Sequence, residues 1–318
     1  MENKKLKSIR DGFGEALAKL GEENKDVVVL TADLADSTRV KQFAEKFSDR
    51  FFQVGVAEQA LVTVAAGMAE AGKIPFTTSY AVFSPGRTFE QIKVTVCLNN
   101  LPVKIIGAHA GFGAAMYGAT HQSLEDIALM RTLPGMVVEV PGDFEEAKKA
   151  TVLIGENGKP SYLRLARQDS EVFSKPEDGY QIGKAKILYE GSDPQVAIIG
   201  CGPLLSEALA ASVELSKNGI ETIVINNHTI KPMDELAIIR AAKTCGAIVT
   251  IEDHQIHGGM GSAVAEVLAA NFPTPIEFIG VNDMFAESGT TEDMNKKFGL
   301  KKENIVEAVK KVILRKNS

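Results

Sequence analysis

The sequence predicts an α/β protein of two tandem domains, each a mostly parallel sheet flanked by helices. Short, nearly continuous apolar segments alternate with helix-like segments along most of the 318 residues, and this alternation is typical of parallel strands buried on both faces. It loosens between residues 168 and 194, where charge, glycine and proline are frequent, and then resumes. A chain of this length has room for two medium-sized domains.

The first domain is expected over residues 1–170, with a strand at each short apolar run. These runs lie at residues 27–32, 51–55, 74–80, 103–109, 136–140 and 161–166. From Ala57 to Ala71, apolar residues recur at i, i+3 and i+4 spacing, which predicts an amphipathic helix between the second and third strands.

A linker containing a short hairpin is expected over residues 171–193, and a second, smaller α/β domain over residues 194–318. Its strands are predicted at residues 195–202, 221–227, 247–253 and 276–281, with helices between them and at the end. The glycines of HGGMG, residues 257–261, precede one of these helices. They suit either an anion at the helix N-terminus or close packing at the helix entry.

Composition and charge exclude several classes of function. The net charge of −6 argues against a general nucleic-acid binder. No apolar run approaches 18 residues and the charged N-terminus lacks the apolar core of a signal peptide, so we expect no membrane span and a cytoplasmic protein. Cys97, Cys201 and Cys245 are far apart in apolar or small-residue surroundings, which predicts buried free thiols.

Ligands of open α/β sheets bind beyond the carboxyl ends of the strands, so the segments that follow the strands are where chemistry is expected. In the segment 54–60, Glu58 opens a mostly apolar helix; a first-turn glutamate favoured by the helix dipole is the structural alternative to a functional carboxylate. In the segment 79–93, Tyr80, Phe83 and Phe89 follow a strand, and core packing alone would explain them.

A third segment is a glycine- and alanine-rich loop that follows the strand ending at His109. It runs to His121 and to a helix expected to be capped near Ser123, with Glu125 and Asp126 in its first turn. Long small-residue loops that hold histidines are typical of functional sites. The twelve-residue gap between the histidines matches no standard metal-ligand spacing.

Several motifs in this order resemble the transketolase family, and in particular the branch that contains the animal enzymes and the bacterial split transketolases. They are ADL (32–34), AEQ (57–59), PFTTSYAVF (75–83), THQSLEDIALMR (120–131) and EDH…GGMG (252–261). The resemblance covers essentially the whole chain. It implies a pyrimidine-binding domain followed by a transketolase C-terminal domain. The activity it implies is transfer of a two-carbon ketol unit from a ketose phosphate or modified sugar to an aldose phosphate.

The resemblance also shows what this chain lacks. The family binds the diphosphate of thiamine diphosphate and a divalent metal, Mg²⁺ or Ca²⁺, through a further domain with a GDG motif, and this chain contains no GDG. A truncated pseudo-enzyme is one explanation. A split enzyme is favoured, in which an N-terminal partner subunit carries that domain and the metal, and two copies of each chain form an α2β2 assembly. No metal ligand set is then expected in this chain.

The resemblance assigns cofactor contacts residue by residue. Glu58 matches a catalytic glutamate that hydrogen-bonds the pyrimidine ring of the cofactor. Phe83 and Tyr80 match positions that stack on that ring. Val56 matches a position that holds the cofactor bent, and Asp33 matches a residue near the cofactor at the subunit contact.

Substrate contacts follow in the same way. His121 matches the THQ histidine near the donor sugar, where an imidazole suits acid–base catalysis because its charge changes near neutral pH. His109, Arg10, Arg167 and Ser37 match positions that bind the terminal phosphate of sugar phosphates. Paired guanidiniums suit a dianion because each presents a fork of donors.

One departure bears on the substrate. Typical transketolases carry Glu-Asp-Gly before THQ, and the aspartate recognises a donor hydroxyl; this chain has Met116, Tyr117 and Gly118. Tyr117 therefore stands in the substrate-binding position of the aspartate, and a branched or sulfonated ketose becomes a candidate donor. Two alternatives stay open: the β chain of a 2-oxo acid dehydrogenase decarboxylase component, and a non-catalytic transketolase-like regulatory chain.

Overall fold

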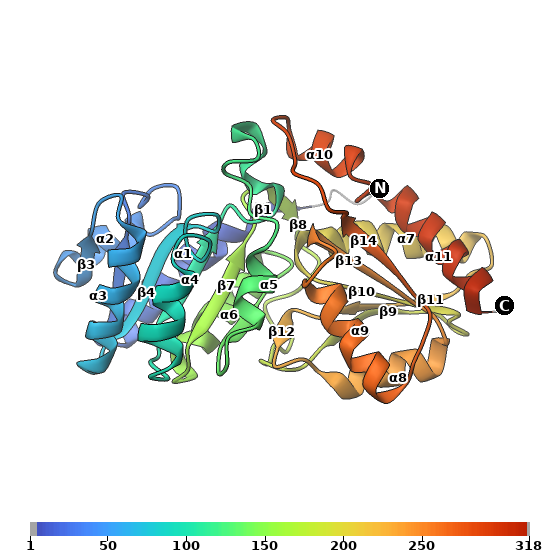
Figure 1. Ribbon diagram of the computed structural model, residues 1–318, viewed down its shortest axis with the longest axis horizontal. Helices are drawn as coiled ribbons and strands as arrows, with labels where there is room; N and C mark the ends of the chain where they lie inside the picture. The colour runs from blue at the N-terminus through green and yellow to red at the C-terminus, as the bar shows by residue number, and fades with distance from the viewer. Residues whose placement is uncertain (1–4, 317–318) are drawn as a thin grey trace.

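A computed structural model describes residues 5–316, which form two α/β lobes side by side along the long axis (Figure 1). The first lobe contains a seven-stranded sheet. Its order is β12 (Thr229–Lys231), β6 (Val137–Glu139), β7 (Ser161–Leu165), β5 (Lys104–Ala108), β4 (Ile74–Tyr80), β2 (Val27–Thr31) and β3 (Phe51–Gln53). All neighbouring pairs are parallel except β12 with β6. The predicted parallel sheet is thus confirmed, and a short strand from the second half of the sequence completes its edge.

The second lobe contains a five-stranded sheet. Its order is β14 (Ile276–Val281), β13 (Ile248–Gln255), β10 (Val196–Gly200), β11 (Thr222–Asn226) and β9 (Lys186–Glu190), with only β9 antiparallel among them. Helices α7 (Leu205–Lys217) and α11 (Lys302–Lys316) pack on one face, and α8 (Glu235–Cys245) and α9 (Met260–Asn271) on the other. The predicted fold class therefore holds for both lobes.

Strand β2 shows why these strands are apolar throughout. Val27 and Val29 belong to a buried cluster with helices α1 (Ile9–Glu23) and α6 (Phe144–Glu156). Val28 and Leu30 belong to a second cluster with α3 (Glu58–Glu70). Side chains alternate between the faces of a strand, and helices cover both faces here, so every position is selected for burial.

Helix α3 is amphipathic in an unexpected way. Leu61, Ala65 and Ala69 are buried as predicted, but Val64 is 42 % exposed. The apolar residues of this helix therefore cover two faces, one buried within the lobe and one turned outward. The neighbouring helical segment, which consists of α4 (Phe89–Gln91) and η2 (Ile92–Cys97), lies beside α3 on the same side of the lobe (Figure 1).

The predicted hairpin in the linker is wrong. Strand β8 (Asp169–Glu171) pairs with β1 (Leu6–Ser8), and β9 pairs with β11 at the edge of the second sheet. Strand β9 thus extends the edge of the second sheet, whereas β8 and β1 form a separate two-stranded sheet, and each strand pairs its backbone groups with a different partner.

The predicted helix cap at Ser123 is also wrong. Helix α5 (Asp126–Arg131) begins at Asp126 and has Glu125 at its N-cap. The carbonyl oxygen of Ser123 instead accepts a hydrogen bond of 2.8 Å from the amide of Gly111. This contact closes the base of the glycine-rich loop, so the backbone of Ser123 belongs to the loop.

A buried polar seam joins the two lobes. Arg164 of β7 donates to Asp126 of α5 over 2.8 Å and to Asp253 of β13 over 2.5 Å, and the hydroxyl of Tyr162 donates to the same Asp126 oxygen over 2.7 Å. Burial acts against the Arg164 charge, but the two carboxylates outweigh it and raise the pKa of Arg164. Because an unpaired charge here would be costly, the three charged groups hold the lobes in one arrangement.

The predicted anion position before α9 is occupied by a side chain of the protein itself. The carboxylate of Glu252 accepts the amides of Met260 and Gly261 over 2.7 and 2.8 Å. A Cβ at Gly259 would lie 2.3 Å from this carboxylate, so the glycines serve close packing around an internal cap.

Two further expectations bear on chemistry and location. Cys201 and Cys245 are buried and Cys97 is partly buried, all as free thiols, and burial raises the pKa values of Cys97 and Cys245 to about 11. Each helix within residues 5–316 is too short or too polar to cross a lipid bilayer.

Candidate functional site

The predicted site residues gather at the carboxyl edge of the first sheet because β7, β5, β4, β2 and β3 are consecutive neighbours that run in one direction. The residues that follow these strands are Arg167 after β7, His109 after β5, Tyr80 and Phe83 at and after β4, Asp33 and Ser37 after β2, and Val56 and Glu58 after β3. Arg10 joins them from the first turn of α1.

Glu58 is the first residue of α3, and only 2 % of its surface is exposed. Its Oε2 accepts a hydrogen bond of 2.9 Å from Nη1 of Arg87, whose side chain is 50 % exposed. The guanidinium of Arg87 also lies over the ring of Phe83, 4.8 Å from its centre. A buried carboxylate whose partner is a half-exposed, movable side chain is well placed to bind a polar group of a ligand.

Aromatic rings from two loops form a wall beside this carboxylate. The rings of Tyr80 and Phe83 are stacked with centres 5.9 Å apart, and the Tyr80 ring lies 3.9 Å from that of His109. The ring of His121 meets the edge of Phe83 at 5.5 Å and lies 5.4 Å from Tyr117. The structure thus brings these predicted residues together around a flat, partly apolar space.

A neighbouring hydrogen bond restrains the ring of His121. The hydroxyl of Thr120 lies 2.9 Å from Nδ1 of His121. Because Nδ1 is engaged locally, Nε2 is the ring nitrogen left for a ligand. A half-buried imidazole with one nitrogen engaged and the other available is suited to proton exchange.

A cationic cluster adjoins the aromatic wall. Arg10 is buried and donates to the carbonyl oxygens of Ser37 over 2.6 Å and Arg167 over 3.0 Å. Burial, followed by repulsion from Arg39 and Arg167, lowers the pKa of Arg10 to about 10. Arg39 pairs with Asp11 over 2.6 Å, so one carboxylate faces three guanidiniums, and the cluster is suited to bind an anion.

His109 links the two parts of the site. It is 2 % exposed and has a backbone φ of +58°, an uncommon conformation that is often found where function constrains the chain. Burial, with the charges of Arg10, Arg167 and Arg39, lowers its pKa to about 3, so the ring is neutral at pH 7. Within residues 5–316, the buried atoms Nδ1 of His109 and Nε of Arg10 have no hydrogen-bond partner.

These side chains are suited to two kinds of ligand group. A buried carboxylate beside stacked aromatic rings suits a flat nitrogen heterocycle, and unpartnered buried nitrogens beside guanidiniums suit an oxyanion. In the part of the chain that the structure describes, no group of three or more His, Cys, Asp or Glu side chains is placed to hold a metal ion.

Two predicted residues lie at the exposed rim of this sheet edge. Val56 is 75 % exposed, and Asp33 is exposed with its amide donated to the side chain of Gln53. Arg87 and Arg39 were not predicted. Arg87 lies four residues after Phe83 in the turn that follows β4, and Arg39 lies two residues after Ser37. Nearness in sequence to predicted residues was therefore the available signal for both.

Comparisons with known proteins agree on one family. The family models "Transketolase, pyrimidine binding domain" and "Transketolase, C-terminal domain" match residues 5–171 and 183–305. The putative transketolase C-terminal section of Methanocaldococcus jannaschii is 43 % identical, over 95 % of each chain. A 6-deoxy-6-sulfo-D-fructose transketolase subunit of a Clostridium species is 40 % identical, over 97 % of this chain and 95 % of that one. A solved structure described as "Split gene transketolase, inactive beta4 tetramer" superposes with a TM-score of 0.90 at 41 % identity, over 97 % of this chain and 99 % of that chain.

Proposed function

This chain belongs to the transketolase family, and from that premise we propose how its residues share in the reaction. It is the C-terminal subunit of a split transketolase, a transferase that needs a partner chain. The family depends on thiamine diphosphate, which when bound supplies a sink for carbanion electrons. The observation that carries the proposal is the buried carboxylate of Glu58 beside the aromatic wall.

With the cofactor bound, Glu58 would hold its nitrogen-bearing ring, and its buried carboxyl group could share a proton with that ring. Arg87 donates to Glu58 in the structure. Its long, half-exposed side chain would turn toward solvent when the ring binds and replaces it as the partner of Glu58. Phe83 and Tyr80 provide the flat surface on which the ring rests. Val56 and Asp33 contact the cofactor from the rim, where the partner chain approaches.

His121 moves protons at the oxygens of the donor sugar. Thr120 engages Nδ1 of this histidine, and Nε2 is then the atom that donates or accepts. Tyr117 stands beside His121 and replaces a hydroxyl-binding aspartate with a larger, neutral phenol.

Arg10, Arg167 and His109, with Ser37 holding Arg10 in place, bind the anionic end of the sugar. The low pKa of His109 keeps its ring neutral beside the guanidiniums, so it serves as a hydrogen-bond donor. The anion is a phosphate or a sulfonate. The relative that acts on a sulfonated ketose, together with Tyr117, supports a modified ketose as the donor.

The partner subunit carries the diphosphate-binding domain and the divalent metal, Mg²⁺ or Ca²⁺, in an α2β2 assembly. The outward face of α3 is the contact surface we propose, since Ala60, Val64 and Gly67 are exposed along one side of the helix. The neighbour described as an inactive tetramer of β chains supports the view that this chain without its partner self-associates and lacks activity.

Reconstitution with a partner that contains the GDG motif tests the proposal. Neither chain alone should transfer a ketol unit, whereas the mixed chains should do so in a metal- and thiamine diphosphate-dependent manner. A panel of ketose phosphates, branched ketoses and sulfonated ketoses then identifies the donor. Turnover by this chain alone would refute the split-enzyme proposal, and release of carbon dioxide from a 2-oxo acid would support the dehydrogenase alternative. An assembled pair that binds cofactor without turning over any donor would support a regulatory chain.

A further inference from the structure

We propose that the C-terminal domain positions the catalytic loop of the first domain, and that Gln122 and Thr291 are its positioning residues. The site loop is defined here as residues 111–122, which carry Tyr117 and His121. The brace is defined as residues 287–291, which precede and begin helix α10 (Thr291–Lys297). The inference rests on the proposed function, because it concerns the geometry of the same site.

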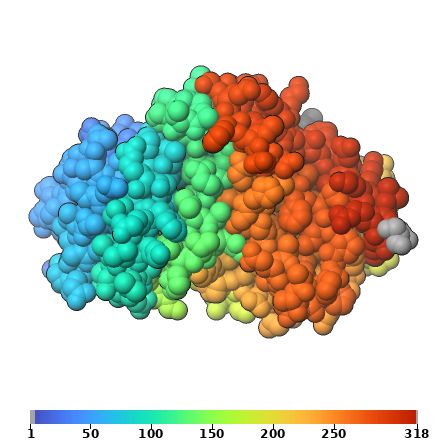
Figure 2. Space-filling model, in the orientation of Figure 1, coloured from blue at the N-terminus to red at the C-terminus, as the bar shows by residue number. Residues whose placement is uncertain are grey.

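Within its own domain, the site loop is held at its base and by the ring of His121 against that of Phe83. Its base is closed by the bridge between Gly111 and Ser123, and its first half is a short helical turn, η3 (Phe112–Tyr117). In the views of Figures 1 and 2, this loop rises above the sheet and meets the segment around α10, whose residues come from the far end of the sequence.

Three hydrogen bonds connect the loop to the brace. The side-chain amide of Gln122 donates to the carbonyl oxygen of Glu287 over 2.8 Å and, within the loop, to the carbonyl oxygen of Ala115 over 3.3 Å. The backbone amide of Gly289 donates to the same carbonyl oxygen of Ala115 over 3.2 Å. The hydroxyl of Thr291 donates to the carbonyl oxygen of Phe112 over 3.2 Å. The loop is therefore held at its start, its middle and its end.

Packing fits the same two segments together. The ring of Phe112 stacks on that of Phe298 in the turn after α10, with centres 5.2 Å apart. Gly118 has a φ of +76°, and a Cβ there would lie 2.6 Å from the hydroxyl of Ser288. The loop thus follows the shape of the brace closely, and a side chain at this glycine would push the two apart.

One peptide unit connects the residue that contacts the brace, Gln122, to the catalytic residue, His121. Gln122 is 4 % exposed and faces the brace, while the adjacent His121 faces Phe83 and Tyr117. Anchoring Gln122 therefore fixes the backbone from which the His121 ring projects. Catalysis depends on orientation to within a fraction of an ångström, so a freely moving loop would lower turnover even if every catalytic group were present.

Isosteric variants of the positioning residues test the inference in the complete two-chain enzyme. Thr291→Val removes the hydroxyl and keeps the shape, Thr291→Ser restores the hydroxyl, and Gln122→Met removes the amide donor at similar length. Thr274→Val is the matched control, because its hydroxyl also donates to a backbone carbonyl, that of Phe272, in the C-terminal domain.

We expect Thr291→Val and Gln122→Met to lower kcat by about 3- to 30-fold, with the KM of the anionic substrate changed little. Amide hydrogen exchange of residues 111–122 should become faster by about 3- to 10-fold, an indication of easier local opening. Thr291→Ser and Thr274→Val should match the wild type in both measurements.

Two results would overturn the inference: unchanged loop exchange in both variants, or faster exchange with wild-type kcat, which would make the brace merely structural. The failure of the proposed function has a different signature, since the wild-type pair would then transfer no ketol unit at all. Faster exchange of the site loop in the variants of such an inactive pair would still support the brace as the element that orders the loop.

Discussion

At the scale of residues, the site is made of buried groups that are incompletely paired. Glu58 has a movable partner in Arg87, and the buried Nδ1 of His109 has no hydrogen-bond partner in residues 5–316. Buried polar groups without partners lower stability. Their presence at one sheet edge therefore indicates atoms that a ligand satisfies.

The carboxylate of Glu58 should be essential for turnover. Glu58→Gln keeps the shape and a hydrogen-bonding side chain but cannot exchange a proton, so we expect kcat of the reconstituted enzyme to fall by about 10²- to 10⁴-fold. A coupled ketol-transfer assay measures the loss, and size-exclusion chromatography checks that the chains still assemble. Glu70→Gln, at the exposed end of the same helix, should leave both unchanged. Turnover of Glu58→Gln within threefold of wild type would remove this residue from the mechanism.

The guanidinium of Arg10 should select substrates with an anionic tail. Arg10→Met removes a buried charge-assisted donor, each worth about 1.5–3 kcal/mol, so we expect KM for a phosphorylated or sulfonated ketose to rise about 10- to 100-fold. The kcat should change little, because the contact is made equally before and during reaction. Steady-state kinetics with charged and uncharged ketoses provides the test. Arg240→Met, at an exposed position on α8, is the control. An equal rise in KM for uncharged ketoses would contradict the assignment.

The sequence was sufficient to predict residues whose positions follow from strand order. Tyr80, His109 and Arg167 come together because their strands are neighbours in a parallel sheet. The place of Arg87 beside Glu58 depends on the path of the turn after β4, which alternating apolar residues do not specify. Family motifs predict the roles of these residues, whereas their contacts depend on the three-dimensional paths of the loops.

At the scale of elements, the fold depends on where helices come close. Helices α1 and α6 cross at Gly12, where a Cβ would lie 2.3 Å from the carbonyl oxygen of Phe144. Helix α3, by contrast, presents Gly67 on its outward face, where a Cβ would meet nothing within 4 Å. Gly12 thus permits a close helix crossing, whereas Gly67 lies in open space where a side chain would fit.

Replacing these glycines by alanine should change stability in opposite directions. Gly12→Ala forces two backbones apart, and we expect a loss of about 1–3 kcal/mol in the free energy of unfolding, despite the better helix propensity of alanine. Gly67→Ala adds helix propensity without a clash and should stabilise the isolated chain by up to about 1 kcal/mol. Urea unfolding of both variants measures the difference. A stabilising Gly12→Ala would contradict the close crossing.

Periodicity predicted the main strands and the start of α3, but not pairing across long distances. A short hairpin was expected within the linker, where β8 and β9 do not pair with each other, and β12 was not expected in the first sheet. Strands β9 and β12 pair with sheet edges contributed by distant segments, and β8 pairs with β1 in a separate two-stranded sheet. Local pattern specifies that a segment is extended, whereas the available edges of the folded sheets decide its partner.

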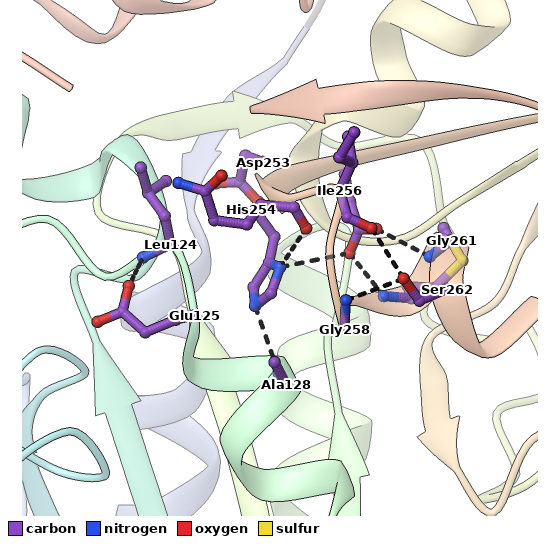
Figure 3. Close-up of polar contacts among 12 residues, drawn as sticks. Leu124, Glu125, Ala128, Asp253, His254, Ile256, Gly258, Gly261 and Ser262 are labelled. Atoms are coloured by element: carbon purple, nitrogen blue, oxygen red, sulfur yellow. Dashed lines mark hydrogen bonds and ion pairs between the residues drawn. The ribbon is translucent and has the colours of Figure 1, made fainter. Parts of the chain in front are cut away.

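At the scale of the whole molecule, a buried histidine at the seam between the lobes predicts that stability depends on pH. His254 of β13 is buried, its Nδ1 donates to the carbonyl oxygen of Gln255 over 2.7 Å, and its Nε2 accepts the amide of Ala128 in α5 over 3.3 Å (Figure 3). The amide can only donate, so the ring is neutral. Burial lowers the pKa of His254 to about 4.

Acidification should therefore destabilise the wild type more than His254→Gln. The unfolded histidine takes up its proton near pH 6.5 and the folded one only near pH 4, so unfolding binds protons within that window and stability falls as pH falls. We expect the wild type to lose about 1–3 kcal/mol more than the variant between pH 7 and pH 4. Burial raises the pKa of Glu252 to about 7, so this group makes the protein more stable as the pH falls from 7 to 4.5. This opposite contribution is present in both proteins and does not affect their difference.

Unfolding by urea at pH 7, 5.5 and 4 measures this difference. His257→Gln is the matched control, because His257 is exposed three residues away and should follow the wild type at every pH. Parallel pH curves for the wild type and His254→Gln would show that the seam histidine contributes nothing to acid sensitivity.

We expect a second subunit to cover the outward face of α3. Val64 is 42 % exposed on this helix beside small residues, and apolar surface of this kind favours association. We therefore expect the isolated chain to form an oligomer and Val64→Asp to shift it toward monomer by at least tenfold in dissociation constant, because burying an unpaired carboxylate costs more than about 1.4 kcal/mol. The same variant should weaken binding of the partner and reduce reconstituted activity.

Val213→Asp, on α7 with 53 % exposure, is the matched control. Sedimentation of each variant alone measures self-association, and sedimentation with the partner measures binding of the partner. If both variants behave alike, association does not use this face of α3, and the partner must dock elsewhere on the first lobe.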